Sequence, residues 1–557
     1  MLTYPHFEPT FPREKWTLPY VLEHQATVRA NKPFIQWTDE NPALTYAETN
    51  KVVNRLAHGL AAQGVKKGDR VVLFLPNCLE YVLTWFALNK LGAAEVTVGD
   101  TYKGDFLRHQ LNLSQAKIII TSDTLAERVA FVEHELPHAQ KLILWEDPEQ
   151  RPEGETKLKR LTTQPFSVLY SDNDSNPGVE VSTRDIAAVL FTSGTTGLSK
   201  GVLMPHAQLY LFSEQDVQFM ELTEEDTYAT AFPLFHGNAQ FLTVYPSLIA
   251  GGRCVLYRRF SASDWLGRMR RSGATVCNLL GATMAFVLAQ PETAGDKDHK
   301  LRCIYSAPTS PDLAGKFRER FGNKRFAEAF GQTEICLPFM SLPDRDFPPG
   351  ACGVLVDQWF EIRLADPETG EDVPEGQLGE LLVRNKFPFT INDGYLGMPE
   401  KTVEARRNLW FHTGDALKRD KDGWYYFLDR VKDALRRRGE NISSFEVESV
   451  VRAHPAVAEC AVIAVKADEQ GGEDEVKACV ILKEGGKVTA EEIIAWCDPR
   501  MPYFMVPRYI EFMAAFPQTP SEKIQKVKLR EAGVNANTWD RVKSGVKLTE
   551  ELKRAKK

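Results

Sequence analysis

The stretch LFTSGTTGLSKGVLMPH, from Leu190 to His206, places a cluster of glycine, serine and threonine between two apolar runs and ends the cluster with Lys200. Ordering glycine costs conformational entropy, so a dense glycine cluster in a folded region needs a reason. Phosphate binding is one reason, because backbone N–H groups and hydroxyls can surround phosphate oxygens while a lysine supplies positive charge. An ordinary surface loop is the alternative, and local composition alone does not exclude it.

The loop matches neither of the two standard phosphate-binding patterns. The P-loop pattern requires glycine directly before its lysine and Ser or Thr directly after it, whereas serine precedes and glycine follows Lys200. The dinucleotide-binding pattern requires a third glycine that Gly194 and Gly197 lack. The flanking runs DIAAVLF and GVLM predict short strands, and the next helix is expected to begin near His206. The loop therefore connects two strands.

Composition excludes several classes of protein. A chain of 557 residues is several times longer than a typical domain, so we expect two or more hydrophobic cores. A net charge of -7 argues against non-specific nucleic-acid binding as the main role. None of the cysteines is paired at the spacing of a zinc ribbon or a redox motif, so we expect free thiols in a reducing compartment.

The chain carries no pattern that would send it to a membrane. Its N-terminus lacks the apolar core of a signal peptide, and no run of about 18 apolar residues could span a bilayer. We therefore expect a cytoplasmic protein without a transmembrane segment. The sequence does not indicate an oligomeric state.

Strand-like and helical patterns alternate from about Leu44 to Tyr426. Runs such as DRVVLFLPN, AKIIIT and RCVLY read as strands, and TYAETNKVVNRLAHGLAAQG reads as an amphipathic helix. Such alternation favours parallel sheets covered by helices. The polar segment between Arg151 and Asp185 is expected to be a long surface excursion.

The pattern changes near residues 429–432, after which a smaller mixture of strands and helices begins. We predict an α/β fold with a large N-terminal domain of stacked sheets covered by helices, residues 1–430. A small, mobile α+β C-terminal domain is predicted for residues 431–557.

Four further stretches join the opening loop. They are FAEAFGQTEICLP (326–338), LWFHTGDALKRDKDGWYYFLDRVKD (409–433), RRRGENISSFEVE (436–448) and PQTPSEKIQKVKLRE (517–531). With these motifs in this order and at this spacing, the chain resembles, over nearly its whole length, the acyl-adenylate-forming superfamily of acyl-CoA synthetases, peptide-synthetase adenylation domains and luciferases. RRRGENISSFEVE most resembles the carnitine/crotonobetaine–CoA ligase branch.

The resemblance implies two half-reactions. A carboxylate attacks the α-phosphate of ATP to give an acyl-adenylate and pyrophosphate, and the thiol of coenzyme A then attacks the mixed anhydride. Such chemistry depends on positioning and charge neutralisation. The partners implied are a carboxylic acid, ATP, Mg²⁺ and CoA, with no nucleic acid.

The resemblance also implies roles for residues of the nucleotide site. The β- and γ-phosphates would be held by Thr192, Ser193, Gly194, Thr195, Thr196 and Lys200. The rest of the nucleotide would meet Ser306, Ala307, Phe330 and Gly331 at adenine, Thr333 at the α-phosphate, and Asp415 and Arg430 at the ribose hydroxyls. Glu334 would help to hold Mg²⁺. Two residues depart from the usual pattern: Ser199 replaces proline and Phe330 replaces tyrosine.

The C-terminal motifs imply residues for the two half-reactions. Lys523 matches the catalytic lysine that bridges the carboxylate and the α-phosphate. Glu522 stands before it in place of glycine and puts a negative charge beside it; Lys526 is a poor substitute by register. Lys432 matches the hinge, and Gly439 matches the glycine that lets the pantetheine arm pass close to the backbone.

The CoA phosphates are expected to meet some of the three arginines 436–438, and the sequence leaves open which of Arg436, Arg437 and Arg438 does so.

The acyl pocket is expected at two places in the chain. AFPLFHGNAQ matches the family's gate, with His236 as the gating residue, although a buried histidine is commonly a core residue. Residues 278–282, including Gly281, would form a floor suited to a short to medium acid, branched, cyclic or carnitine-like. Phe232, Phe235 and Phe241 are candidates for an aromatic cage around an ammonium group.

Three other functions share these motifs. The acyl group could pass to a carrier protein in place of CoA, or the adenylate could be oxygenated as in luciferases. The chain could also be a non-catalytic ATP-binding homologue, against which the presence of Lys200, Glu334, Asp415 and Lys523 argues.

Overall fold

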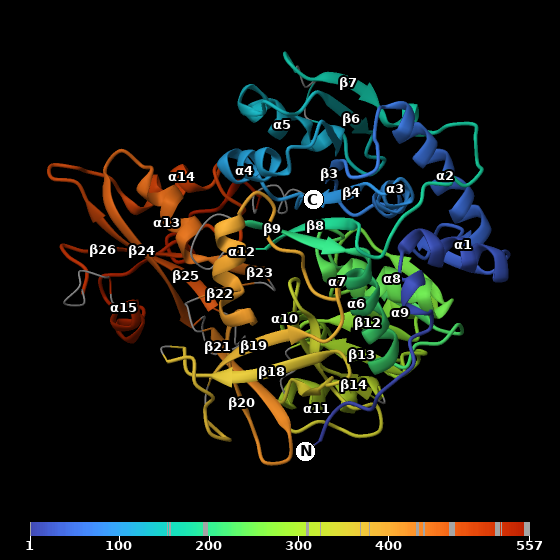
Figure 1. Ribbon diagram of the computed structural model, residues 1–557. Helices are drawn as coiled ribbons and strands as arrows, with labels where there is room; N and C mark the ends of the chain where they lie inside the picture. The colour runs from blue at the N-terminus through green and yellow to red at the C-terminus, as the bar shows by residue number, and fades with distance from the viewer. Residues whose placement is uncertain are drawn as a thin grey trace. The chain divides into compact units, whose positions relative to one another are not determined.

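The structure, a computed structural model, describes residues 2–152, 154, 158–192, 199–307, 311–323, 325–367, 369–377, 379–430, 434–437, 440–466, 474–517, 524 and 526–550. The chain divides into two compact units (Figure 1). The large unit comprises Met1–Asp100, Leu111–Phe191 and Gly201–Val431. The small unit comprises Thr101–Gln110, Thr192–Lys200 and Lys432–Lys557.

The first of three seven-stranded sheets has the order β7-β6-β5-β3-β4-β8-β9, and its pairings from β7 through β8 are parallel. Its strands are β3 (Arg70–Phe74), β4 (Ala94–Thr97), β5 (Ile118–Ser122), β6 (Lys141–Trp145), β7 (Thr162–Pro165), β8 (Ile186–Thr192) and β9 (Lys200–Pro205). The strands expected on both sides of the opening loop are therefore confirmed as β8 and β9.

The second sheet has the order β14-β13-β12-β10-β11-β1-β2 and is parallel except where β2 pairs with β1. Its strands are β1 (Pro33–Trp37), β2 (Leu44–Thr45), β10 (Thr227–Thr230), β11 (Arg253–Leu256), β12 (Val276–Leu279), β13 (Cys303–Ser306) and β14 (Arg325–Ala327). The prediction of parallel sheets is confirmed for these two.

The third sheet is antiparallel throughout, in the order β15-β16-β17-β21-β20-β19-β18. Its strands are β15 (Ala329–Gln332), β16 (Cys336–Met340), β17 (Gly353–Leu355), β18 (Phe360–Ala365), β19 (Gly379–Asn385), β20 (Phe411–Arg419) and β21 (Trp424–Arg430). The expectation of parallel strands up to Tyr426 is wrong here. Parallel neighbours need long crossovers, whereas turns as short as the one joining β20 to β21 permit only antiparallel pairing.

Helices accompany the sheets of the large unit. They are α1 (Leu18–Val28), α2 (Tyr46–Ala62), α3 (Leu79–Lys90), α4 (Gly104–Ser114, which runs across the division between the units), α5 (Ala126–Val132), α6 (His206–Phe219), α7 (Gly237–Ala239), α8 (Tyr245–Ala250), α9 (Trp265–Ser272), α10 (Gly281–Leu288), α11 (Pro311–Phe321) and α12 (Pro399–Ala405). A π-helix, η5 (Gln240–Val244), lies between α7 and α8, and the 3₁₀ turns are η1 (Arg13–Lys15), η2 (Asp123–Leu125), η3 (Glu133–Glu135), η4 (Phe166–Leu169) and η6 (Arg407–Leu409).

The polar segment after Arg151 is more regular than expected. Thr162–Pro165 forms β7, which pairs with β6 as the last strand of the first sheet, and Phe166–Leu169 forms η4. Phe166 and Leu169 are buried and so anchor the segment on the core. The prediction of a surface excursion is wrong for these residues, because two apolar side chains outweigh the polar composition around them.

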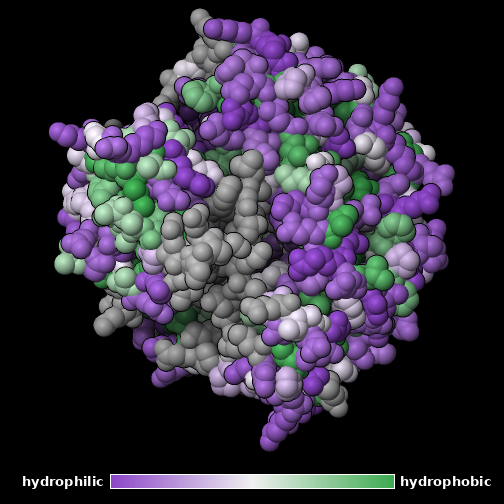
Figure 2. All heavy atoms as spheres, turned by 60° about the vertical axis from the view of Figure 1, so that its left-hand side comes forward, coloured by the Kyte–Doolittle hydropathy of each residue, from purple (hydrophilic) through white to green (hydrophobic). Residues whose placement is uncertain are grey.

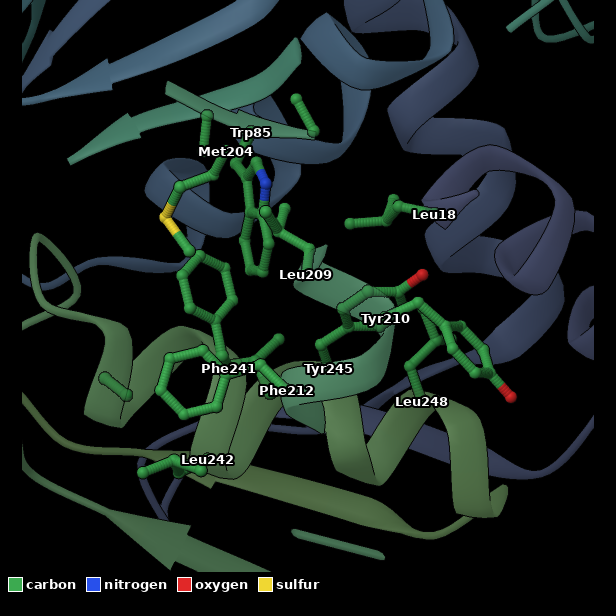
Figure 3. Packing of buried hydrophobic residues seen from close by; sticks show 14 of the residues in the cluster. Leu18, Trp85, Met204, Leu209, Tyr210, Phe212, Phe241, Leu242, Tyr245 and Leu248 are labelled. Carbon is green, nitrogen blue, oxygen red and sulfur yellow. The ribbon is translucent and has the colours of Figure 1, made fainter. Parts of the chain in front are cut away.

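The core of the large unit is built around α6, whose side chains are almost all buried (Figure 3). The ring of Phe241 lies 5.8 Å from that of Phe212 on α6 and 5.9 Å from that of Trp85 on α3. Phe241 was a candidate for an aromatic cage and is instead a fully buried core residue. The helix begins at His206 as predicted, and burial lowers the pKa of that imidazole to about 3.

The small unit contains a hairpin and a four-stranded sheet of order β24-β25-β26-β27. Its elements are β22 (Ala434–Arg437), β23 (Glu440–Ser443), α13 (Ser444–Arg452), β24 (Val457–Lys466), β25 (Asp474–Leu482), α14 (Ala490–Cys497), β26 (Tyr509–Phe512), α15 (Lys526–Ala532) and β27 (Trp539–Asp540). Apolar residues of α13, α14 and the sheet form its own buried cluster. The stacked sheets and the smaller α+β unit confirm the predicted fold class.

Hydrophilic residues predominate among the described residues on the face shown in Figure 2. No helix in the described part of the chain combines the length and the apolar character that a bilayer span requires. All nine cysteines are buried free thiols, as their spacing predicted.

One buried carboxyl group makes the stability of the fold sensitive to pH. Asp216 on α6 is fully buried, and neither of its carboxyl oxygens has a hydrogen-bond partner among the described residues. Burial raises the pKa of Asp216 well above its usual value of 3.8. The folded protein therefore retains a proton that the unfolded chain loses, so stability falls as pH rises above about 4.

We predict that Asp216→Asn removes this loss. The variant should become more stable relative to the unchanged protein as the buffer changes from about pH 5 to about pH 8, because its side-chain amide does not titrate in this range. Melting temperatures of both proteins across this range provide the measurement, with the exposed Asp172 changed to Asn as the control. The prediction would be contradicted if the difference in melting temperature between Asp216→Asn and the unchanged protein were the same at both pH values.

Candidate active site

The motif residues Phe330 to Glu334 lie at the end of β15 and in the turn before β16. The backbone carbonyl of Thr333 accepts a hydrogen bond from Gln208 Nε2 at 2.8 Å. The carbonyl of Glu334 accepts two, from the backbone N–H of Asn392 at 2.9 Å and from its Nδ2 at 3.0 Å. Side chains from α6 and from the segment after β19 therefore fix the backbone of this turn.

The carboxylate of Glu334 is connected to the strand that follows the glycine-rich loop. Tyr395 donates from its hydroxyl to Glu334 Oε1 at 3.0 Å, and Tyr395 forms a β-bridge with Val202 of β9. Backbone hydrogen bonds on both sides of this bridge strengthen it, at 3.0 Å from Leu203 N–H to Gly394 and at 2.8 Å from Leu396 N–H to Gly201. The orientation of Glu334 therefore depends on β9 through one tyrosine.

Asp415 is held by a residue of the same motif. Gln332 Nε2 donates to Asp415 Oδ2 at 2.6 Å and to the carbonyl of Thr413 at 3.1 Å. Asp415 is 3% exposed and lies opposite Arg430 in the register of β20 and β21. Because the amide donates to it, the carboxylate presents an acceptor of fixed direction.

The turn before Asp415 is fixed by a second carboxylate. Glu380 Oε1 accepts a hydrogen bond from the backbone N–H of Gly414 at 3.2 Å, and Glu380 Oε2 lies 3.1 Å from His412 Nδ1. Burial alone would raise the pKa of Glu380, but the hydrogen bond and charge of His412 and the Gly414 N–H bring it below its usual value. Gly414 has a φ of +71°, which favours glycine at this turn.

The residues expected at adenine occupy two strand ends. The ring of Phe330 is stacked on that of Phe427, with centroids 5.8 Å apart. A side chain at Gly331 would place its Cβ 2.1 Å from the carbonyl oxygen of Cys336, so glycine is required there. Ser306 ends β13 and is fully buried, with its hydroxyl donating to Met284 Sδ at 3.4 Å, while Ala307 is half-buried.

The residues expected around the acyl group lie on neighbouring elements. His236 is half-buried and precedes α7, with its ring centroid 4.2 Å from that of Phe235. Gly281 is the first residue of α10. The amide of Asn278, at the end of β12, donates to Asn238 Oδ1 at 2.6 Å and to Thr243 Oγ1 at 2.8 Å. The floor and the gate are thus joined by hydrogen bonds.

Several predicted residues lie outside the described part of the chain: Ser193, Gly194, Thr195, Thr196, Lys432, Gly439 and Lys523, together with the side chain of Arg430. Thr192 ends β8 and Lys200 begins β9, so the two described ends of the opening loop are the strand ends that the sequence predicted.

Two cations of the small unit are engaged within it. Arg437 is 3% exposed; it donates to the carbonyls of Phe504 at 3.0 Å and Val506 at 3.1 Å and pairs with Glu475 at 2.8 Å. Lys526 Nζ lies 2.6 Å from Glu448 Oε1 and donates to Ser444 Oγ. Arg437 is therefore a structural residue, and Lys526 supports the packing of α15 on α13.

Among the described residues, no group of three or more His, Cys, Asp and Glu side chains could hold a metal ion by itself. A single carboxylate such as Glu334 suits Mg²⁺, which commonly binds through one or two carboxylates and completes its octahedron with phosphate oxygens and water.

Sequence reasoning missed the residues that hold the motif side chains and the backbone around them: Gln208, Gln332, Glu380, Asn392, Tyr395 and His412. Gln332 stands inside a quoted motif, next to residues that were assigned, and an amide there was a usable signal. Gln208 is 125 residues from Thr333 in the sequence, and Tyr395 is 61 residues from Glu334. No local sequence pattern marks such distant partners.

The chain matches two family profiles. That of the AMP-binding enzyme matches residues 22–396, and that of the AMP-binding enzyme C-terminal domain matches residues 446–523. A crotonobetaine/carnitine–CoA ligase of Citrobacter koseri is 31% identical over 509 residues, covering 87% of this chain and 93% of the relative.

Solved structures resemble the chain over nearly its whole length. o-Succinylbenzoate CoA synthetase from Bacillus subtilis, bound to a product analogue, has a TM-score of 0.78 and 25% identity, covering 95% of this chain and 99% of its own. ATP-bound MatB from Rhodopseudomonas palustris has a TM-score of 0.67 and 26% identity, covering 93% and 99%.

We predict that Arg437→Ala destabilises the protein. The change breaks a buried ion pair and leaves two carbonyls without their donor, a loss of about 3 kcal/mol that should lower the melting temperature by at least about 3 °C. The exposed Arg345, paired with its neighbour Asp344, provides the control, because exposed pairs contribute less than about 1 kcal/mol. Equal melting temperatures for Arg437→Ala and Arg345→Ala would contradict the structural role.

Proposed function

Since the chain belongs to the AMP-binding enzyme family, we propose that it is a carboxylic acid–CoA ligase that uses ATP and works through an acyl-adenylate. The observation that carries the proposal is the pair of oriented carboxylates in the large unit. Gln332 Nε2 donates a hydrogen bond to Asp415 Oδ2 at 2.6 Å, and the Tyr395 hydroxyl donates one to Glu334 Oε1 at 3.0 Å. Two carboxylates with different partners suit two different parts of a magnesium nucleotide.

In the proposed complex, Asp415 accepts hydrogen bonds from both ribose hydroxyls, and Arg430 assists from the facing position on β21. Phe330 stacks on adenine, and Gly331 lets the base approach the backbone. Thr333 binds the α-phosphate beside Glu334, which holds Mg²⁺. The loop from Thr192 to Lys200 binds the β- and γ-phosphates.

Adenylation forms a bond between a carboxylate oxygen of the acid and the α-phosphorus, and it breaks the bond to pyrophosphate. We assign to Lys523 the neutralisation of charge between the two anions during this step. The thiolate of CoA then attacks the acyl carbon, and AMP leaves. In this proposal the small unit turns about Lys432 between the steps, and Gly439 faces the pantetheine arm.

The contacts of Arg437 reduce the number of arginines that could bind the CoA phosphates. Its guanidinium is buried and already binds two carbonyls and Glu475, which argues against a role at the CoA phosphates. Arg436 and Arg438 remain as the candidates. Lys526 is likewise bound to Glu448, which supports Lys523 as the catalytic lysine.

We propose that the acid has a short to medium acyl chain. It would belong to the class used by the crotonobetaine/carnitine–CoA ligase to which this protein is 31% identical. The aromatic residues open to this role are Phe232 and Phe235, since Phe241 belongs to the core. The second candidate is transfer of the acyl group to an acceptor other than CoA, which would share the adenylation site.

The test is a panel of carboxylic acids incubated with ATP, Mg²⁺ and CoA, with and without a trimethylammonium group on matched acyl chains. We expect AMP, pyrophosphate and a thioester in equal amounts with at least one acid. ADP as the nucleotide product would overturn the adenylate mechanism. Acid-dependent pyrophosphate release without thioester would favour the second candidate.

We predict that Gln332→Leu raises the KM for ATP by about tenfold while the KM for the acid stays within about twofold. The leucine removes the donor that directs Asp415, a charge-assisted hydrogen bond with a value of about 1.5 kcal/mol or more. Steady-state kinetics with each substrate varied in turn provide the measurement.

The control for this prediction is Gln358→Leu, because Gln358 bonds the backbone of Phe7 at 2.8 Å and 2.9 Å and touches none of the motif residues. An equal rise in the KM for ATP in both variants would show that the effect comes from general loosening of the large unit.

A further inference from the structure

The segment from Phe232 to Thr243, called the gate segment here, joins β10 to α8 and contains His236. It includes only short helical pieces: α7 covers three residues, and within η5 the backbone of Leu242 is non-helical, with φ −119° and ψ 22°. Residues before α7 form no regular element, so their peptide groups need partners from elsewhere in the fold.

Asn77 supplies the first set of partners. Its Nδ2 donates to the carbonyl of Phe232 at 2.8 Å and to that of Tyr257 at 3.2 Å, while its Oδ1 accepts from the backbone N–H of Leu234 at 2.8 Å. Asn77 lies between β3 and α3 and is 9% exposed. One side chain thus binds two peptide groups of the gate segment from a position more than 150 residues earlier in the chain.

Gln240 supplies the second set. Its Nε2 donates to the carbonyl of Leu234 at 2.8 Å and to Glu95 Oε2 at 3.3 Å. Glu95 is fully buried on β4, and burial raises the pKa of its carboxyl group well above the usual value. Both the N–H and the C=O of Leu234 are therefore bound by amide side chains, Asn77 on one side and Gln240 on the other.

Asn278 secures the far end of the segment, since its amide donates to Asn238 and Thr243. The aromatic ring of Phe241, at the same end of the segment, is packed between Trp85 and Phe212 (Figure 3). His236 lies between these anchors, two residues after Leu234. Its backbone N–H donates to the carbonyl of Pro233 at 3.1 Å, so the way in which Leu234 is held affects its position.

We propose that Asn77 and Gln240 are positioning residues that hold Leu234, and through it His236, at the entrance of the acyl pocket and thereby set the affinity and selectivity for the acid. This inference rests on the proposed function for the role of the pocket. The hydrogen bonds of Asn77 and Gln240 to the backbone of Leu234, called the clamp, do not depend on that function. Neither residue needs to touch the acid, because their bonds are made to the backbone of the gate segment.

The clamp is tested first without turnover, by hydrogen–deuterium exchange in Asn77→Ala and Gln240→Met. Methionine keeps the length of glutamine and removes its donors. We expect the amides of the gate segment to exchange at least about fivefold faster in each variant, because a lost bond to Leu234 frees the loop. The two variants act from different sides, so one remains informative if the other does not fold.

The matched control is Asn89→Ala. Asn89 is a buried asparagine on α3 whose Nδ2 donates to the carbonyls of Ala187 at 2.8 Å and Ala93 at 3.3 Å. It makes bonds of the same kind outside the gate segment. We expect Asn89→Ala to lower the melting temperature and to leave exchange in the gate segment unchanged. Unchanged gate exchange in both Asn77→Ala and Gln240→Met would overturn the clamp.

Kinetics then test the consequence. In Asn77→Ala and Gln240→Met we expect the KM for the preferred acid to rise by about fivefold to tenfold and its advantage over other acids to shrink. The KM for ATP should stay within about twofold. A parallel rise of both KM values, or the same change in Asn89→Ala, would overturn the role in acid selection. If no acid is turned over by the unchanged protein, the proposed function fails while the exchange result still decides the clamp.

Discussion

The hydrogen bond from Gln332 to Asp415 is the contact on which the candidate site depends most. Its donor lies at the end of β15 and its acceptor on β20, strands that are separated by β16, β17 and β21 in the sheet order. The bond can form only if the antiparallel sheet brings these strand ends together. A buried carboxylate at 3% exposure also needs such a donor, because an unpaired buried charge costs several kcal/mol. The geometry of the candidate site is thus a property of the whole sheet.

The same logic links the remaining motif residues. Glu334 depends on Tyr395, which depends on its bridge to β9, the strand that starts at Lys200. The turn before Asp415 depends on Glu380 in β19. Glu334, Asp415 and the turn before Asp415 therefore each have a partner on a different element, and the large unit contains all of these partners. Rigid elements with interlocked side chains are what a site needs when catalysis depends on positioning.

The sequence predicted a good part of this fold. The spacing of apolar residues and the local composition identified six elements, because each has a local pattern of apolar residues. They are β3, β5, β8, β9, β11 and α2. It misread the direction of pairing in the sheet of β15–β21, where that direction depends on the connections and not on the strands themselves. Motif order singled out Thr333, Glu334 and Asp415 as candidates. Their partners were not predicted: Gln208 lies 125 residues from Thr333, and Tyr395 lies 61 residues from Glu334. Long-range pairs of this kind leave no trace in a single sequence. The roles assigned to the motif residues, including Thr333, Glu334, Asp415, Lys200 and Lys523, remain predictions.

The central claim is that a carboxylate oxygen of the acid attacks the α-phosphorus of ATP at this site. The most direct measurement uses an acid whose carboxylate carries oxygen-18, with mass spectrometry of the nucleotide product after thioester formation. One labelled oxygen is expected in each AMP, because the attacking oxygen stays on phosphorus when the thiolate displaces AMP from the acyl carbon. Unlabelled AMP, or label in inorganic phosphate accompanied by ADP, would contradict it.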